Sequence, residues 1–95
     1  MLLKNGSFYY EKRLVSGDLR VTGETIAAFS PQTAEGLVPL ANEEVLELGG
    51  AAVIPAFLDI HTHGAVGVDV NAASAEDFEK LARFFARQGT GSFLC

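Results

Sequence analysis

Hydrophobic and polar residues alternate in short runs along the first half of the chain, which is the spacing of β-strands with one buried face. Residues 18–22 and 25–29 alternate in this way on either side of a Gly-Glu pair. The same reading places an earlier hairpin at Asn5-Gly6, between strands at residues 1–4 and 7–10, because Asn-Gly tolerates the positive φ of a tight turn. The pattern therefore predicts two β-hairpins before residue 30.

A loop and three short apolar segments follow the hairpins. Residues 30–42 hold two prolines and a glycine with little periodicity, which predicts a loop, and residues 43–48 resemble a strand. Residues 51–54 and 57–60 are nearly continuous apolar runs, as in strands that are buried on both faces of a parallel sheet. The chain thus changes character after residue 50.

The third pattern is helical and covers residues 74–88. Ser74 is a favoured N-cap, Gly89 is a favoured residue just past a helix end, and apolar residues recur at helical spacing between them: Phe78, Leu81, Ala82 and Phe85. Residues 90–95 then resume as a strand. Strand, loop, helix and strand make one βαβ unit, whose crossover is right-handed in nearly all proteins. The predicted class is α/β, with β-rich residues 1–54 followed by the βαβ unit.

Composition and charge restrict the partners. The net charge is −5 with a pI near 4.8, and the seven Lys and Arg residues are scattered, so nucleic acid is not an expected partner. No apolar run approaches the roughly 20 residues that span a bilayer, and the first residues are too short for a signal peptide. A membrane is therefore not an expected partner, and a cytoplasmic protein is the expectation. The single cysteine, Cys95, agrees with a reducing compartment.

The candidate chemistry lies at the end of the run at residues 57–60. His61 and His63 follow with one residue between them, so alternation along a strand would put both imidazoles on one face together with Asp59. Two imidazoles that converge can bind a divalent ion such as zinc or iron, although two histidines at a strand end can also be unliganded. Asp59 would either orient a histidine by accepting its second N–H or form a salt bridge with a later residue.

Two segments carry a family resemblance. Residues 55–64 resemble the first barrel strand of the amidohydrolase superfamily, whose pattern is Pro-Gly-hydrophobic-hydrophobic-Asp-x-His-x-His. Residues 63–69 and 89–94 resemble the corresponding segments of the N-acetylglucosamine-6-phosphate deacetylase family. Ala56 and Gly91 depart from the usual glycine and threonine, and neither is a proposed ligand.

The resemblance implies a specific fold and activity. Residues 1–54 would form part of a small β-sandwich, and residues 55–95 would begin a TIM-type (β/α)8 barrel. Since such a barrel takes about 250 residues, the 95-residue chain is expected to be an amino-terminal fragment that is inactive alone. The parent, the complete protein of which this chain would be the amino-terminal fragment, would hydrolyse the acetamide of N-acetylglucosamine 6-phosphate with one or two metal ions bound by His61 and His63. Its general base would lie beyond Cys95.

Several alternatives stay open at this point. Gly64 and Gly67 are candidates for a loop that contacts substrate, although glycine after a strand also serves turns. Dihydroorotase-like cyclic amidases share the paired histidines, but dihydroorotases typically carry an arginine at the position of Ala65; deaminases are a further alternative. A non-catalytic fragment that self-associates is the competing non-enzymatic hypothesis, and a homo-oligomer is expected in either case.

Overall fold

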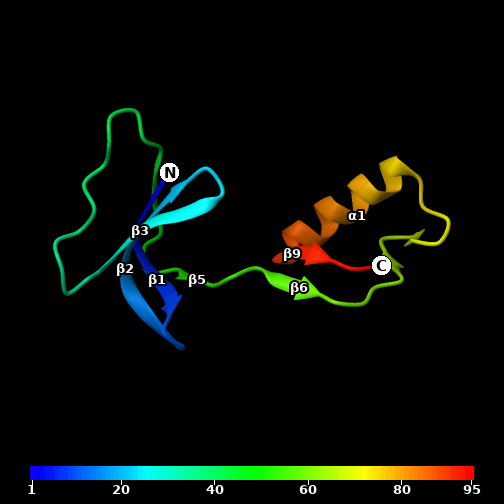
Figure 1. The fold of residues 1–95 in the computed structure, drawn as a ribbon, viewed down its shortest axis with the longest axis horizontal. Coiled ribbons are helices and arrows are strands. Elements are labelled where there is room, and N and C mark those ends of the chain that lie inside the picture. The colour runs from blue at the N-terminus through cyan, green and yellow to red at the C-terminus, as the bar shows by residue number, and fades with distance from the viewer. The chain divides into compact units, whose positions relative to one another are not determined.

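The computed structural model describes all 95 residues and divides into two compact units, Met1–Ile54 and Pro55–Cys95. The first unit contains only strands, and the second contains the one helix (Figure 1). The strands of the first unit are β1 (Leu2–Tyr10), β2 (Arg13–Thr22), β3 (Thr25–Pro31), β4 (Val45–Glu47) and β5 (Ala52–Val53). The second unit holds β6 (Phe57–Asp59), β7 (Gly64–Ala65), β8 (Val68–Asp69), α1 (Ala75–Arg87) and β9 (Thr90–Phe93). The predicted mixed α/β class is confirmed.

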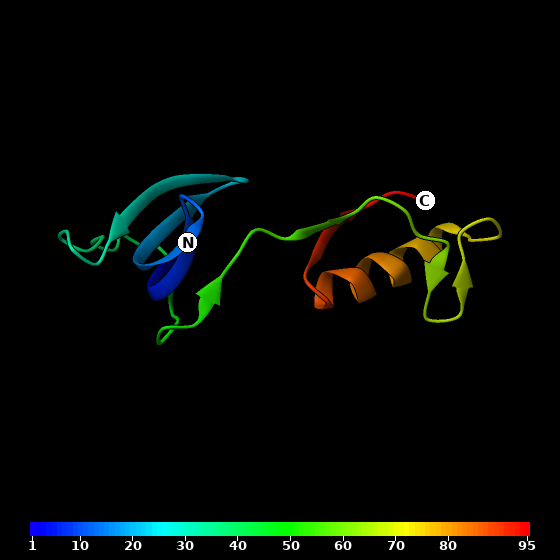
Figure 2. The same ribbon diagram turned by 90° about the horizontal axis from the view of Figure 1, so that it is seen from below.

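The first unit is one twisted sheet with β1 at its centre. Strands β1, β2 and β3 are consecutive and antiparallel and twist together (Figure 2), while β4 and β5 run parallel to successive parts of β1. The predicted hairpin around the Gly-Glu pair is confirmed as β2 and β3. Leu2 and Phe8 of β1 are buried and form the core of this sheet.

The predicted hairpin at Asn5-Gly6 is wrong. β1 runs unbroken through both residues, and Asn5 has a φ of 54° where the pairing register with β2 shifts between Leu3 and Gly6. The Asn-Gly pair therefore forms a bulge, because a bulge also needs a residue that tolerates positive φ. The turn between β1 and β2 instead uses Glu11 and Lys12, with φ of 47° and 65°.

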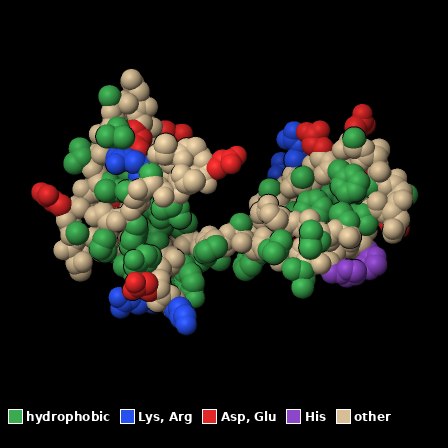
Figure 3. All heavy atoms as spheres, viewed as in Figure 1, with side chains coloured by type: hydrophobic (Ala, Val, Ile, Leu, Met, Phe, Trp, Pro, Cys, Tyr) green, Lys and Arg blue, Asp and Glu red, His purple; other side chains and the backbone are tan.

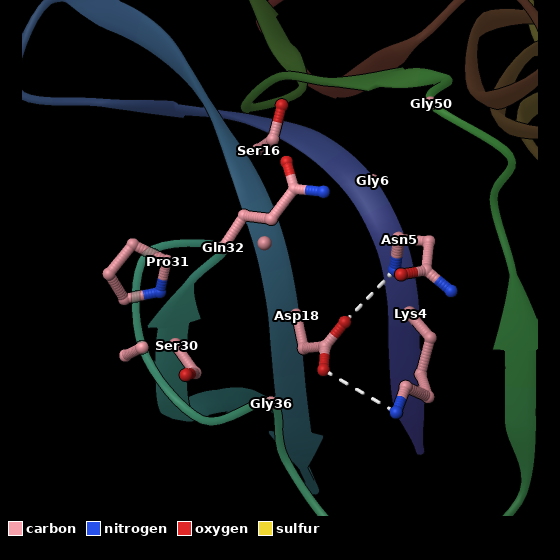
Figure 4. A pocket seen from close by; sticks show the side chains of 12 residues that line it. Lys4, Asn5, Gly6, Ser16, Asp18, Ser30, Pro31, Gln32, Gly36 and Gly50 are labelled. Carbon is pink, nitrogen blue, oxygen red and sulfur yellow. Dashed lines mark hydrogen bonds and ion pairs between the residues drawn. The ribbon is translucent and has the colours of Figure 1, made fainter.

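The carboxylate of Asp18 holds this bulge in place. Its Oδ1 accepts the backbone N–H of Asn5 at 3.0 Å and its Oδ2 accepts that of Leu37 at 3.0 Å, beside a pocket of about 440 Å³ (Figure 4). Burial opposes ionisation of Asp18, but these N–H groups and the Lys4 ammonium at 3.6 Å outweigh it and lower the pKa. Both carboxylate oxygens are thus engaged in joining the bulge to the loop after β3.

A second carboxylate, Glu43, fixes the far end of the same loop. Arg20 donates to it through two nitrogens, Nε at 2.7 Å and Nη2 at 2.9 Å, and the backbone N–H of Leu40 adds a third bond at 3.0 Å. The Arg20 hydrogen bonds, supported by that N–H, lower the pKa of Glu43 from 4.5 to about 2. The ionised form of Glu43 is therefore favoured by folding.

This shift predicts an acid-labile contribution to the stability of the first unit. A folded pKa below the unfolded value gives stability that is present above pH 4.5 and lost as the pH falls to about 2. Glu43→Gln should remove this pH dependence. The urea concentrations at the unfolding midpoints of the wild type and the variant should therefore converge as the pH falls from 4.5 to about 2. Tyr9 and Tyr10, the only tyrosines, both lie in β1, so tyrosine fluorescence reports this unit. Glu24→Gln, at an exposed carboxylate without a hydrogen-bond partner, is the control; a Glu43→Gln profile parallel to wild type would contradict the prediction.

The second unit pairs two parallel strands with the helix between them in sequence. β6 and β9 are neighbours, and α1 packs against β9 through Leu81, which is fully buried, and Phe85, whose ring centroid lies 4.7 Å from that of Phe93 (Figure 1). Ser74 caps α1 in a reciprocal capping box with Asp77. The predicted helix and both flanking strands are confirmed, whereas the short β7–β8 hairpin was not predicted.

Large apolar side chains remain exposed along β6. Phe57 and Leu58 are each 61% exposed although adjacent strand residues point to opposite faces, and Ile60, just past the end of β6, is 73% exposed. Both faces of β6 therefore lack cover within this chain.

α1 is too short and too polar to span a membrane.

Candidate metal centre

His61 and His63 lie side by side on the surface of the second unit (Figure 3). Their Nε2 atoms are 3.1 Å apart, and the rings meet edge to face with centroids 4.8 Å apart. Both residues follow the end of β6 at Asp59, so regular strand alternation does not extend to them as the sequence suggested. The two imidazoles nevertheless converge at the carboxyl end of that strand.

The segment before His63 is fixed by backbone hydrogen bonds. Asp59 Oδ1 accepts the backbone N–H of His61 at 3.1 Å, and Thr62 donates its N–H to the carbonyl of Leu94 at 2.9 Å. Asp59 therefore acts on the main chain of His61, and no bond from its carboxylate to an imidazole nitrogen is present. Its predicted role toward an imidazole or a later residue stays a prediction.

The segment after His63 turns at once into the β7–β8 hairpin. The carbonyl of His63 accepts the N–H of Val70 at 3.0 Å, and the Thr62 hydroxyl accepts the N–H of Gly64 at 3.2 Å. Thr62 was not predicted from the sequence. The pattern that could have indicated it is a hydroxyl-bearing residue two positions before a glycine in a turn. His63 is thus held from both sides by main-chain contacts.

The two candidate glycines differ in their surroundings. Gly64 has a φ of 129°, and an added Cβ would lie far inside contact distance of the Val68 carbonyl oxygen. Gly67 has a φ of 80°, and a Cβ there would meet no atom within 4 Å. The space beside Gly64 is therefore filled by the hairpin itself, whereas Gly67 is open.

An additional carboxylate lies near the pair. Asp69, at the end of β8, accepts the backbone and side-chain N–H groups of Asn71 at 2.9 and 3.0 Å. These bonds lower the pKa of Asp69, with a smaller contribution from the charge of His63. Asp69 therefore adds negative charge near His63.

The spacing of the imidazoles suits a shared ion. Two nitrogens bound to tetrahedral zinc at about 2.05 Å lie about 3.3 Å apart, close to the 3.1 Å observed between His61 and His63. Imidazole is also a good ligand for iron. No group of three or more His, Cys, Asp or Glu side chains that could hold an ion is present in the chain.

Comparisons with known proteins identify relatives of two kinds. No family model matches the chain. It is 37% identical to N-acetylgalactosamine-6-phosphate deacetylase of Escherichia coli O157:H7, over 80% of the chain and 18% of that protein. It is 38% identical to a probable dihydroorotase-like protein of Helicobacter pylori, over 73% of the chain and 17% of that protein. Identity to N-acetylglucosamine-6-phosphate deacetylase of Vibrio furnissii is 26%, over 95% of the chain and 21% of that protein.

These matches confirm the resemblance inferred from residues 55–64 and 89–94. The chain spans about a fifth of the length of the curated relatives that it matches. Deacetylases and dihydroorotases occur together among them, so the comparisons do not separate these two activities. Over most of its length, the chain is similar to deacetylases and dihydroorotases of the amidohydrolase superfamily.

Proposed function

We propose that the chain is the amino-terminal part of a metal-dependent hydrolase that removes the acetyl group from an N-acetylated amino-sugar 6-phosphate, with N-acetylglucosamine 6-phosphate as the expected substrate. The observation that carries the proposal is the 3.1 Å approach of His61 and His63 at the carboxyl end of β6. The similarity to two amino-sugar phosphate deacetylases supports it.

The proposed fold of the parent follows from the second unit. β6, α1 and β9 would be the first βαβ unit of a (β/α)8 barrel, and the first unit would belong to a small β-sandwich. TIM-type barrels place their active sites at the carboxyl ends of their strands, which is where His61 and His63 lie. The uncovered apolar residues on both faces of β6 support the same assignment, because strands of parallel sheets are normally covered on both sides.

The residues of this chain would have distinct duties. His61 and His63 would hold one or two ions, zinc or iron. A bound ion supplies a water of lowered pKa and polarises the amide carbonyl. Asp59 and Thr62 would keep the two histidines in place, because their side chains accept the backbone N–H groups of His61 and Gly64. The general base and the remaining ligands would come from residues outside this chain.

The second candidate is hydrolysis of a cyclic amide, which the dihydroorotase names among the relatives favour. Against it, Ala65 stands where dihydroorotases typically carry an arginine. A methyl group cannot donate the bidentate hydrogen bonds with which a guanidinium recognises a carboxylate. We therefore place the deacetylase first.

The test is a substrate comparison on the longer protein that contains this chain. We expect acetate release from N-acetylglucosamine 6-phosphate or its galacto epimer, and loss of that activity when a chelator removes the metal. Dihydroorotate should not be hydrolysed above background. Hydrolysis of dihydroorotate with no acetate release from either sugar would replace the first candidate by the second.

A further inference from the structure

We infer that the β7–β8 hairpin is a positioning element that holds His63 against His61, and that Gly64 is the residue that lets it do so. The inference rests on the proposed role of the two histidines as ligands. It starts from their separation: only Thr62 lies between them, and neither side chain is buried, so packing does not fix their rings. A hydrogen bond of 3.1 Å between their Nε2 atoms joins the rings, and the main-chain anchors on either side set where the two residues lie.

The first anchor is the sheet, and the second is the hairpin. Thr62 is bound to Leu94, beyond the end of β9, through its N–H. One residue later, the carbonyl of His63 is bound to Val70, and Gly64 pairs with Asp69 across the hairpin. His63 is therefore the junction between the two anchors, and a shift of the hairpin would move its imidazole relative to that of His61.

Closure of the hairpin depends on the absence of a side chain at Gly64. The Val68 carbonyl oxygen occupies the position that a Cβ would take, the Asp69 Cα would lie 3.3 Å from that Cβ, and the φ of 129° is one that other residues rarely adopt. Any larger residue would force the two strands apart at their first pair. Gly67 shares the positive φ but has open space, so its substitution tests backbone strain without the collision.

The hairpin is also tied to α1. Lys80 Nζ donates to the carbonyl of Val66 at the hairpin tip, at 2.9 Å. Val66 has a φ of 49°, a strained value for a β-branched residue, so the turn needs outside support. Lys80 supplies it from a helix whose buried side is fixed by Leu81 and Phe85. The hairpin that follows His63 is thereby tied to α1.

The test uses nuclear magnetic resonance on the 95-residue chain, which contains only these two histidines, at a concentration at which light scattering shows a monomer. With ring centroids 4.8 Å apart, the carbon-bound protons of the two imidazoles should give a nuclear Overhauser signal without any metal. We expect Gly64→Ala to abolish this signal and Gly67→Ala to retain it. A Gly64→Ala chain that keeps the signal, or a Gly67→Ala chain that loses it equally, would overturn the inference.

A second variant guards against loss of folding. If circular dichroism shows that Gly64→Ala has lost its helix, Lys80→Met is the deciding variant. We expect Lys80→Met to keep the helix and to lose most of the inter-imidazole signal. An unchanged signal in Lys80→Met would overturn the inference. Titration with Zn²⁺ separates this inference from the proposed function. If Zn²⁺ leaves the histidine signals of the wild-type chain unmoved, ligation by this pair is contradicted, while the comparison of metal-free variants still decides the role of the hairpin.

Discussion

Replacement of His61 or His63 by alanine in the longer protein is expected to lower its rate of acetate release by about tenfold or more. Each imidazole would be one of a small set of ligands, and the 3.1 Å approach of the two Nε2 atoms would let both bind the same ion. Loss of either weakens the charge that lowers the pKa of bound water and polarises the amide. The metal content per protein should fall in the same variants.

Arg83→Ala provides the matched control for these substitutions. Arg83 lies on the exposed face of α1, in the same unit as the histidines, and its ion pair with Glu79 is solvent-exposed. Such pairs contribute little to stability, so rate and metal content should match those of the wild type. Histidine variants with unchanged rate and unchanged metal content would contradict the assignment of both ligands.

The second large effect concerns the 95-residue chain by itself, which is expected to show no measurable deacetylase activity and to self-associate. It would provide two ligands and has no group of three or more that could hold an ion, so a bound ion would lack most of its coordination. β6 and β9 are a pair with free outer edges, and unpaired edges tend to recruit further strands. Leu58 and Phe57 add exposed apolar surface on opposite faces of β6.

Light scattering over a concentration series, with an acetate-release assay on the same samples, measures both claims. Leu58→Lys should reduce association, because a charged side chain on an edge strand opposes pairing. Ile26→Lys on β3 is the matched control, since Ile26 and Leu58 are 69% and 61% exposed but lie in different units. A chain that stays monomeric at high concentration would contradict the association, and metal-dependent acetate release would contradict the inactivity.

Local signals explain most of what the sequence predicted about the fold. The capping box of Ser74 and Asp77 and the stripe at Leu81 and Phe85 are encoded within one helix, so α1 could be placed to within a residue. The Asn5-Gly6 error arose because a bulge and a turn require the same backbone conformation. Only pairing with distant residues, such as the bond from Asn5 to Asp18, distinguishes the two.

The convergence of His61 and His63 was predictable from the sequence, and the contacts that support them were not. The spacing of His61 and His63 predicted their convergence, although it arises from a turn beyond β6 rather than from strand alternation. The β7–β8 hairpin is only two residue pairs long and shows no hydrophobic periodicity. The collision that a Gly64 side chain would make with Val68 depends on a fold-back that no local pattern records, so it could not be predicted from the sequence.

Metal binding by His61 and His63 is measured most directly in a metal-bearing crystal structure of the longer protein, with the ion located by anomalous scattering. We predict that His61 Nε2 and His63 Nε2 both lie about 2.0 to 2.3 Å from a divalent ion at the carboxyl end of β6. An ion bound elsewhere, or either imidazole turned away from it, would contradict the assignment of these two residues as metal ligands.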